Sequence, residues 1–391
     1  MTLKLNPPKW TADWKPEEFR VRKYIFDTWR TVCESFWYQE YLWPLVEEAA
    51  IWEAKSGEDV GGTELTKITN RDGEISDLAL RPEMTPTVTR MIAKYQREYT
   101  KPIRWFSIAN FYRNERPQRG RNREFWQCNV DIFGSESQMA DIEVLQMAIE
   151  LMKSFGATSE QFQLYLNDRR VVDWFLDSLS LDVELRKEAV RTMDKWDKLS
   201  KEDFASTLAD KWCDGVQIDE IVKFMKSEIL DGVFATEINA IYVSLVELWY
   251  GDIVKIKPSL MRGFDYYDGM VFEVFDLHPD NNRALFGGGR YNGLADIFGV
   301  KEPLPAVWFA PGDEPMRLFL ESWELLPDDL QLETYYIPLL DESKQFEVMN
   351  KAQELRAEGK RVEVGTKVMK ENKAYDYAAK KGMDKDHLVI V

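Results

Sequence analysis

Residues 111–134 read FYRNERPQRGRNREFWQCNVDIFG, two apolar runs separated by a strongly basic segment. Pro117 and Gly120 interrupt any helix there, so the segment is predicted to be a loop between two strands. A guanidinium group stays charged and binds phosphate oxygens bidentately, which suits a nucleotide or a nucleic-acid end, although a solvated basic turn would have the same composition. Against the single carboxylate Glu115, the segment carries five arginines within eleven residues: Arg113, Arg116, Arg119, Arg121 and Arg123.

The second strand of this stretch has an unusual face. Side chains alternate between the two faces of a strand, so four residues are expected to point the same way: Phe125, Gln127, Asn129 and Asp131. An aromatic ring, two amides and a carboxylate form a poor core pattern but a good lining for a pocket that binds a polar small molecule. The stretch therefore predicts a basic loop beside a polar binding face.

Two further segments gather polar or glycine residues. MRGFDYYDGMVFE, residues 261–273, places Arg262, Asp265 and two tyrosines just before a predicted strand. LFGGGRYNGL, residues 285–294, contains a triple glycine that permits close approach of the backbone to a ligand. These glycines lack the Lys-Ser/Thr of a P-loop and do not match the dinucleotide fingerprint. Taken alone, they are more typical of a glycine-rich turn or bulge in a sheet.

The composition argues against several classes of function. The 391 residues include two histidines, His278 and His387, which are expected at the surface, and three widely spaced cysteines. A histidine-based triad, a zinc site and a disulfide framework are therefore not predicted. With no long apolar run and no signal peptide, a cytoplasmic location is expected. The net charge of −17 argues against non-specific nucleic-acid binding over the whole surface, but not against a local basic site.

The order of the expected elements indicates an α+β protein with two domains. Residues 1–326 mix helices and strands, and a wholly helical stretch at about 170–250 interrupts them. After a linker at residues 327–329, residues 333–391 alternate strands and helices, which predicts a small α/β domain with a largely parallel sheet. The chain ends in the apolar run HLVIV, which is typical of a strand, and we expect this domain to be truncated.

Six segments in order resemble the motifs of the histidyl-tRNA synthetases, a family of class II aminoacyl-tRNA synthetases. YLWPLVEEAAIW (41–52) resembles motif 1, LRPEMTP (80–86) the segment that faces histidine and ATP, and residues 111–134 motif 2. TMDKWDKL (192–199) resembles a stretch of the helical part, RGFDYY (262–267) the histidine-specific motif, and GGGRYNGL with the run to Gly312 the second histidine motif and motif 3. HIGH and KMSKS, the motifs of the other synthetase class, are absent.

The resemblance implies a fold and a reaction. The fold is an antiparallel sheet with flanking helices for catalysis in residues 1–326, a helical insertion, and an α/β anticodon-binding domain in residues 333–391. The reaction is the ATP-dependent activation of L-histidine to histidyl-adenylate, followed by transfer to tRNA(His), whose acceptor end would touch Arg116 and Gln118. The family also implies Mg²⁺ on the phosphates and a homodimer that pairs through motif 1 near Pro44.

The ATP-binding residues implied by the resemblance lie in the basic stretch and in the histidine-specific motif. Arg113 and Arg262 would hold the α-phosphate of ATP and stabilise the charge that builds up as the carboxylate of histidine attacks. Phe125 would pack on adenine, and Glu115 would accept a hydrogen bond from it. The two arginines are therefore the expected catalytic residues.

The histidine-binding residues are implied in the same way. Asp131 and Tyr267 would face the two imidazole nitrogens, and a site of this kind rejects amino acids that lack either partner. Glu83 and Thr85 would hold the α-amino group. The full set implied is Glu83, Thr85, Gln127, Asp131, Tyr266, Tyr267 and Tyr291.

One position departs from the family pattern. Histidyl-tRNA synthetases usually carry a motif 3 arginine that stacks on adenine, and Pro315 stands in its place here. Arg317 is the nearest candidate to contact ATP instead. Two residues on a helix correspond to about 200°, so Arg317 is expected to face away unless the helix begins irregularly.

Two other functions fit parts of the sequence. A synthetase-like paralogue that senses histidine, or serves as a regulatory subunit without aminoacylation, would share the catalytic motifs. Such proteins tend to lose substrate-site residues and the anticodon domain, both of which are largely present here. A nucleic-acid-binding scaffold could use the arginine loop alone, but it leaves Glu83, Gln127, Asp131 and Tyr267 unexplained. The enzyme is therefore the favoured interpretation.

Overall fold

The two apolar runs around the basic loop form neighbouring strands. β5 (Ile103–Tyr112) pairs with β6 (Glu124–Phe133) in antiparallel fashion over ten consecutive residue pairs. The residues of β6 alternate between two environments, because Cys128, Val130 and Ile132 are buried in the apolar core while their polar neighbours face the other way. The two predicted strands are therefore confirmed, while Pro117, Gln118 and Arg119 of the predicted loop lie outside the described residues.

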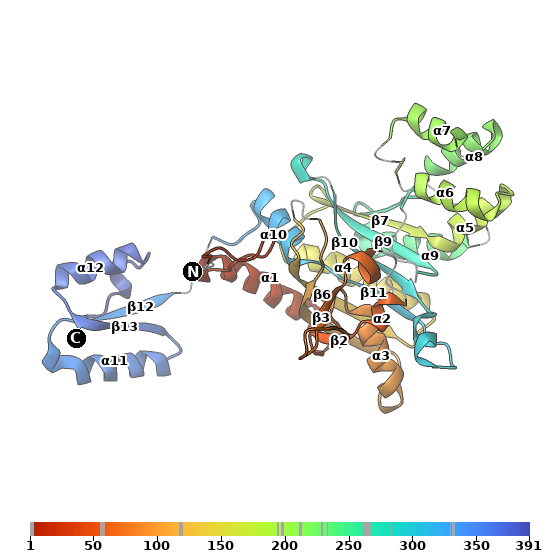
Figure 1. Cartoon of the computed structure of the whole chain (residues 1–391). Coiled ribbons are helices and arrows are strands. Elements are labelled where there is room, and N and C mark those ends of the chain that lie inside the picture. The colour runs from red at the N-terminus through yellow and green to blue at the C-terminus, as the bar shows by residue number, and fades with distance from the viewer. Residues whose placement is uncertain are drawn as a thin grey trace. The chain divides into compact units, whose positions relative to one another are not determined.

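The structure is a computed structural model that describes residues 4–54, 59–116, 120–193, 195–196, 199–210, 213–227, 230–232, 234–260, 267–281, 283–328, 330 and 333–391. The chain divides into two units, Met1–Leu326 and Pro327–Val391. Each unit has its own sheet and its own helices (Figure 1).

β6 lies inside an eight-stranded sheet with the order β1-β5-β6-β11-β10-β9-β7-β8. The six strands from β5 to β7 are antiparallel, whereas β1 and β8 run parallel to their neighbours at the two edges. The antiparallel sheet expected of a class II synthetase is thus confirmed. The other strands are β1 (Gln39–Glu40), β7 (Phe162–Asp168), β8 (Val254–Ile256), β9 (Met270–Asp276), β10 (Ala284–Tyr291) and β11 (Ala306–Phe309).

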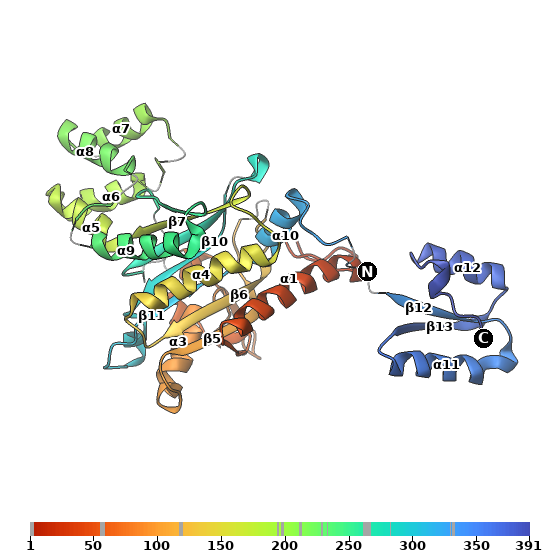
Figure 2. The same cartoon turned by 180° about the vertical axis from the view of Figure 1, so that it is seen from behind.

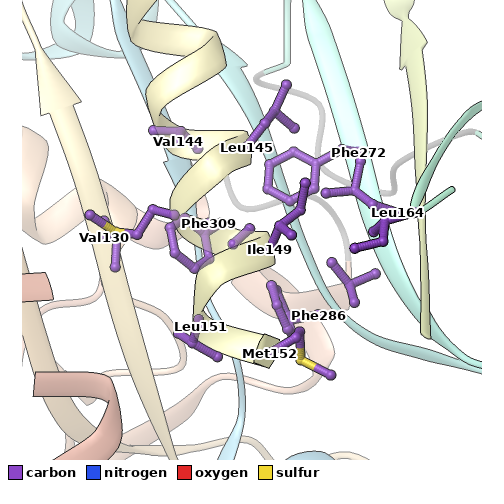
Figure 3. Packing of buried hydrophobic residues seen from close by; sticks show 14 of the residues in the cluster. Val130, Val144, Leu145, Ile149, Leu151, Met152, Leu164, Phe272, Phe286 and Phe309 are labelled. Atoms are coloured by element: carbon purple, nitrogen blue, oxygen red, sulfur yellow. The ribbon is translucent and has the colours of Figure 1, made fainter. Parts of the chain in front are cut away.

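Four helices of the first unit pack against one face of the sheet (Figure 2). α4 is central, and its Leu145 and Ile149 pack with Phe272 and Phe309 of the strands (Figure 3). Burying a side chain of this size contributes about 1.5–3 kcal/mol, so this layer determines which face of the sheet is core. The helices are α1 (Pro16–Ser35), α4 (Gln138–Ser154), α9 (Ala235–Leu245) and α10 (Asp313–Ser322).

The other face of the sheet is partly covered by α3 (Thr85–Tyr95), whose Val88 and Ile92 share a buried cluster with residues of β5 and β6. Thr85 is the first helical residue and Met84 is the N-cap. The Thr85 hydroxyl makes no hydrogen bond with any described residue, so it does not cap the first turn.

A three-stranded antiparallel sheet, β2-β4-β3, precedes α3. β2 begins only at Val46, because Pro44 has no N–H group to donate to a sheet. The elements around this sheet and the short helical turns of the first unit are β2 (Val46–Glu48), α2 (Ala50–Glu53), η1 (Asp59–Thr63), β3 (Thr66–Thr69), β4 (Ile75–Leu80), η2 (Gln96–Glu98), η5 (Pro279–Asn281) and η6 (Leu294–Phe298).

The long helical stretch is present as predicted, between β7 and β8. Its first four helices bury a cluster of their own that includes Leu176, Phe204 and Ile221. The stretch consists of α5 (Arg169–Ser178), α6 (Val183–Met193), α7 (Lys201–Asp210), α8 (Gly215–Met225), α9 and η4 (Val246–Tyr250). Among the described residues, no helix is both long enough and apolar enough to cross a membrane.

The second unit contains a parallel pair of strands, β12 (Thr334–Leu339) and β13 (Arg361–Val368). Its helices are α11 (Gln345–Ala357) and α12 (Glu371–Lys380), with the short turns η7 (Glu342–Lys344) and η8 (Lys385–His387). A role of this unit in anticodon binding stays a prediction.

The third strand predicted for this unit, at HLVIV, is not formed. Asp384 accepts hydrogen bonds from the N–H groups of Asp386 and His387, which winds the start of this run into η8. The His387 ring also lies 2.8 Å from Glu333. Only Leu388 then pairs with β12, through a single bridge to Tyr336.

Candidate functional site

The carboxyl group of Asp131 is the centre of a buried polar cluster. Asp131 is only 1% exposed, and its Oδ1 accepts a 2.8 Å hydrogen bond from the Tyr291 hydroxyl. Within the described part of the chain, Oδ2 has no hydrogen-bond partner. Burial raises the pKa of Asp131 to about 7, although the hydrogen bond from Tyr291 acts in the opposite direction. The cluster therefore presents an acceptor that is suited to a donor from a ligand.

Strand register brings these residues together. Asp131 of β6 pairs with Trp308 of β11, and Trp308 pairs with Gly289 of β10. Because directly opposed residues of a sheet share a face, Asp131, Trp308 and Gly289 form a row. Tyr291 lies two positions along β10 and so points to the same face. The predicted grouping of Asp131 with Tyr291 is therefore present.

The triple glycine lies within β10, where it permits close packing rather than forming a turn. A Cβ on Gly289 would lie 2.6 Å from the Met270 carbonyl oxygen and 2.8 Å from the Tyr267 ring. A Cβ on Gly288 would lie 1.9 Å from the Trp308 carbonyl oxygen. The Tyr267 ring thus lies directly over the strand and stacks on Trp308, with centroids 6.5 Å apart.

The segment LRPEMTP contributes two buried polar side chains, Glu83 and Thr85, which are 2% and 1% exposed. Arg81 fixes this segment to β5 and to motif 1. Its Nε donates to the Asn110 carbonyl at 2.7 Å, and another guanidinium nitrogen donates to the Trp43 carbonyl at 2.7 Å. Arg81 therefore has a structural role that the sequence pattern did not reveal.

The basic stretch places Arg113 beside Phe125. The Nε of Arg113 donates to the Pro82 carbonyl at 2.9 Å, and its guanidinium lies 5.1 Å from the Phe125 ring centroid. Glu115 is 9% exposed, and Arg121 lies 3.4 Å from its carboxylate. These residues thus form a charged and aromatic group at the end of β6 away from Asp131.

The start of α10 closes this end of the sheet. Gly312 forms a bridge with Gln127 of β6, and Asp313 accepts a 2.9 Å hydrogen bond from the Trp126 N–H. The carboxylate of Asp313 also meets the guanidinium of Arg22 at 2.5 Å, and both side chains are buried. The ion pair joins α1, α10 and β6. Neither residue was identified from the sequence, because they are far apart in the chain.

Arg317 is held by two carboxylates on its own helix. Its guanidinium nitrogens lie 2.6 Å from Glu314 and 2.5 Å from Glu321. These ion pairs raise the pKa of Arg317 above its ordinary value. Any contact of Arg317 with a ligand would require it to leave both partners.

The remaining predicted residues are less informative. Arg116 is described and exposed at the start of the basic loop. Arg262, Tyr266 and Gln118 lie outside the described residues. Trp308 was missed in the sequence, because the run AVWF of β11 is uniformly apolar and is typical of a core strand.

The antiparallel sheet, with a buried polar cluster on one face and an arginine-rich segment between two of its strands, has the fold of the class II aminoacyl-tRNA synthetases. The family model described as histidyl-tRNA synthetase matches residues 10–311. The histidine–tRNA ligase of Leptospira biflexa is 37% identical over 384 residues, which cover 96% of this chain and 87% of that protein. The chain belongs to the histidyl-tRNA synthetase family.

Solved structures agree on the fold. The histidyl-tRNA synthetase of Nostoc sp. PCC 7120 superimposes with a TM-score of 0.81 at 20% identity, covering 98% of this chain and 90% of that one. A Bacillus halodurans protein described as an ATP phosphoribosyltransferase regulatory subunit/histidyl-tRNA synthetase gives a TM-score of 0.79 at 21% identity, covering 96% and 97%. At this level of identity, the likeness concerns the fold alone.

Replacing Gly289 by Ala should force the Tyr267 ring away from β10 and destabilise the protein by about 1–3 kcal/mol, the usual cost of overpacking. Urea denaturation followed by fluorescence measures the change. Gly215→Ala is the matched control, because no atom lies within 4 Å of the added Cβ. Equal stability of the two variants would contradict the tight packing of Tyr267 on Gly289.

Proposed function

We propose that this chain is a histidine–tRNA ligase. The carboxylate oxygen of L-histidine attacks the α-phosphorus of ATP, pyrophosphate leaves, and the histidyl group of the resulting adenylate passes to tRNA(His). The observation that carries this proposal is the buried Asp131–Tyr291 pair, which offers an unused carboxylate oxygen on the same sheet face as Phe125.

Histidine recognition follows from that cluster. The imidazole ring donates one N–H to the free oxygen of Asp131, and Tyr267 binds the other nitrogen from its place over Gly289. Asp131 is almost fully buried, so an amino acid that offers no donor leaves the free oxygen of Asp131 unpaired, at a large cost in affinity. The remaining ligands proposed for the amino acid are Glu83, Thr85, Gln127, Tyr266 and Tyr291.

ATP binds at the opposite end of the β6 face. Phe125 packs on adenine, Glu115 accepts a hydrogen bond from it, and Arg113 and Arg262 stabilise the α-phosphate as charge accumulates. Arg317 contacts ATP only if it leaves its two glutamates. Mg²⁺ accompanies the β- and γ-phosphates of ATP as part of the substrate.

The tRNA and a second subunit complete the proposed assembly. Arg116 and Gln118 contact the acceptor end of tRNA(His), and the second unit binds the anticodon. We assign the homodimer interface to the motif 1 region near Pro44, where Trp37, Leu42, Leu45 and Val46 are exposed, Leu42 at 70%. Two more exposed apolar side chains, Ile75 at 76% and Leu78, lie on β4, which pairs with β2. A cytoplasmic location is part of the same proposal.

Histidine-dependent exchange of pyrophosphate into ATP tests the function. The wild-type protein should catalyse this exchange, and no other amino acid should support it. Arg262→Ala should abolish the exchange while retaining histidine binding better than Asp131→Ala does, because Arg262 is assigned to the phosphate and Asp131 to imidazole. Histidine that binds without exchange would favour a histidine sensor, and equal loss of histidine affinity in both variants would refute the two roles.

The raised pKa of Asp131 predicts a pH dependence. As pH falls through about 7, the carboxylate gains a proton and becomes a weaker acceptor for the imidazole N–H. After correction for the titration of free histidine near pH 6.5, the KM for histidine should rise several-fold as the pH is lowered from about 8 to about 6. Asp131→Asn should weaken binding and remove the corrected dependence. A corrected KM that stays constant in the wild type would argue against the role of Asp131.

The proposed dimer predicts that charges at the exposed apolar side chains separate the subunits. In sedimentation experiments, the wild type should run as a dimer and the double variant Leu42→Asp/Ile75→Asp as a monomer, because two buried aspartates would face an apolar surface. Val216→Asp is the control, since this side chain is 74% exposed on α8 in the insertion. A monomeric wild type would exclude the interface.

A further inference from the structure

The start of α10 offers no cation to adenine. Pro315 occupies the position of the family's motif 3 arginine, and its ring lies 3.4 Å from where a Cβ of Gly312 would be. Gly312 in turn bridges Gln127, two residues along β6 from Phe125. The proposed adenine platform therefore has an aromatic ring beneath it, while the nearest arginine of the helix, Arg317, is occupied by Glu314 and Glu321.

A different arginine reaches this place from the connection between β9 and β10. Arg283 immediately precedes β10, and its guanidinium lies against the backbone of Gly120 in the basic loop. A Cβ on Gly120 would lie 1.8 Å from a terminal nitrogen of Arg283 and 2.7 Å from its guanidinium carbon. A side chain at position 120 would therefore displace the guanidinium from this place.

The strand pairing places the start of β10 at the same end of the sheet as the start of α10. Gly288 pairs with Phe309, the Ala310 N–H donates to the Gly287 carbonyl, and Gly312 bridges Gln127 of β6. Arg283 therefore begins at the end of the sheet where α10 starts and Phe125 lies, and its guanidinium reaches the basic loop.

We propose that Arg283 is an ATP-binding residue that supplies the guanidinium missing at position 315. The inference rests on the proposed function, because it places adenine on Phe125. A planar guanidinium stacks on aromatic rings and binds phosphate oxygens, so it can serve the same ligand from another point of the chain. Arg283 thereby contacts both the basic loop and the nucleotide. The same loop contains the ion pair between Glu115 and Arg121.

Kinetics of histidine-dependent pyrophosphate exchange test this role. Arg283→Ala should raise the KM for ATP about tenfold, in the range of one lost cation–π or charged contact, and leave the KM for histidine unchanged. Arg283→Lys should show a smaller rise, because the ammonium keeps the charge but not the planar group. Arg97→Ala is the control for loss of one positive charge, since this exposed residue lies on η2.

A second-site change makes the test specific. Pro315→Arg restores the family's arginine, and in the Arg283→Ala background it should return the KM for ATP most of the way to the wild-type value. An unchanged KM for ATP in Arg283→Ala, an equal rise in both substrates' KM values, a loss confined to tRNA transfer, or no rescue by Pro315→Arg would each overturn the inference.

The wild type separates this inference from the proposed function. If the wild-type protein shows no exchange, the ligase proposal fails. Calorimetric titration with ATP then still compares wild type with Arg283→Ala, and about tenfold weaker binding supports the ATP contact while equal binding overturns it.

Discussion

The antiparallel pairing of β5 with β6 is the constraint on which the rest of the structure depends. Because ten consecutive residue pairs hold the strands in one register, every second residue of β6 faces the helices and the others face the polar cluster. A slip by one residue would turn Asp131 toward the apolar core and remove Val130 from it. The burial of Val130 and Ile132 with residues of α4 therefore stabilises the orientation of Asp131 as well as the sheet.

Two buried carboxyl groups, Asp131 on β6 and Asp313 beside it, differ in their hydrogen-bond and ion-pair partners. The difference separates a structural role from a proposed binding role. Burial raises the pKa of both Asp131 and Asp313. Asp313 meets the guanidinium of Arg22 and the Trp126 N–H, so its charge is compensated and it joins three elements. Among the described residues, Asp131 meets only a phenol, and one oxygen is left without a donor. Such an acceptor costs folding free energy until a ligand supplies the donor.

Elements with a regular apolar pattern could be predicted from the sequence, including β5, β6 and the helical insertion. The HLVIV run could not, because an apolar pattern does not reveal that capping by Asp384 winds its start into a turn. The site was predictable where residues share a strand, as Gln127 and Asp131 do. It was not predictable where contacts join distant segments, because packing of Tyr267 over Gly289 depends on how β9 and β10 pair.

The fold constrains the proposed histidine-binding half of the site more tightly than the proposed ATP-binding half. Asp131 and Tyr291 lie on central strands, and other residues of these strands belong to the hydrophobic core. Each of these two polar side chains can therefore come from only one position of its strand. The guanidinium of Arg283 lies on the connection before β10, and a long side chain can reach one place from several backbone positions. A proline at position 315 is therefore compatible with the proposed ATP binding, whereas the proposed acceptor for imidazole has no alternative origin. On this proposal, amino-acid selection depends on strand register. The adenine contact depends on loops, which can exchange residues without disturbing the register.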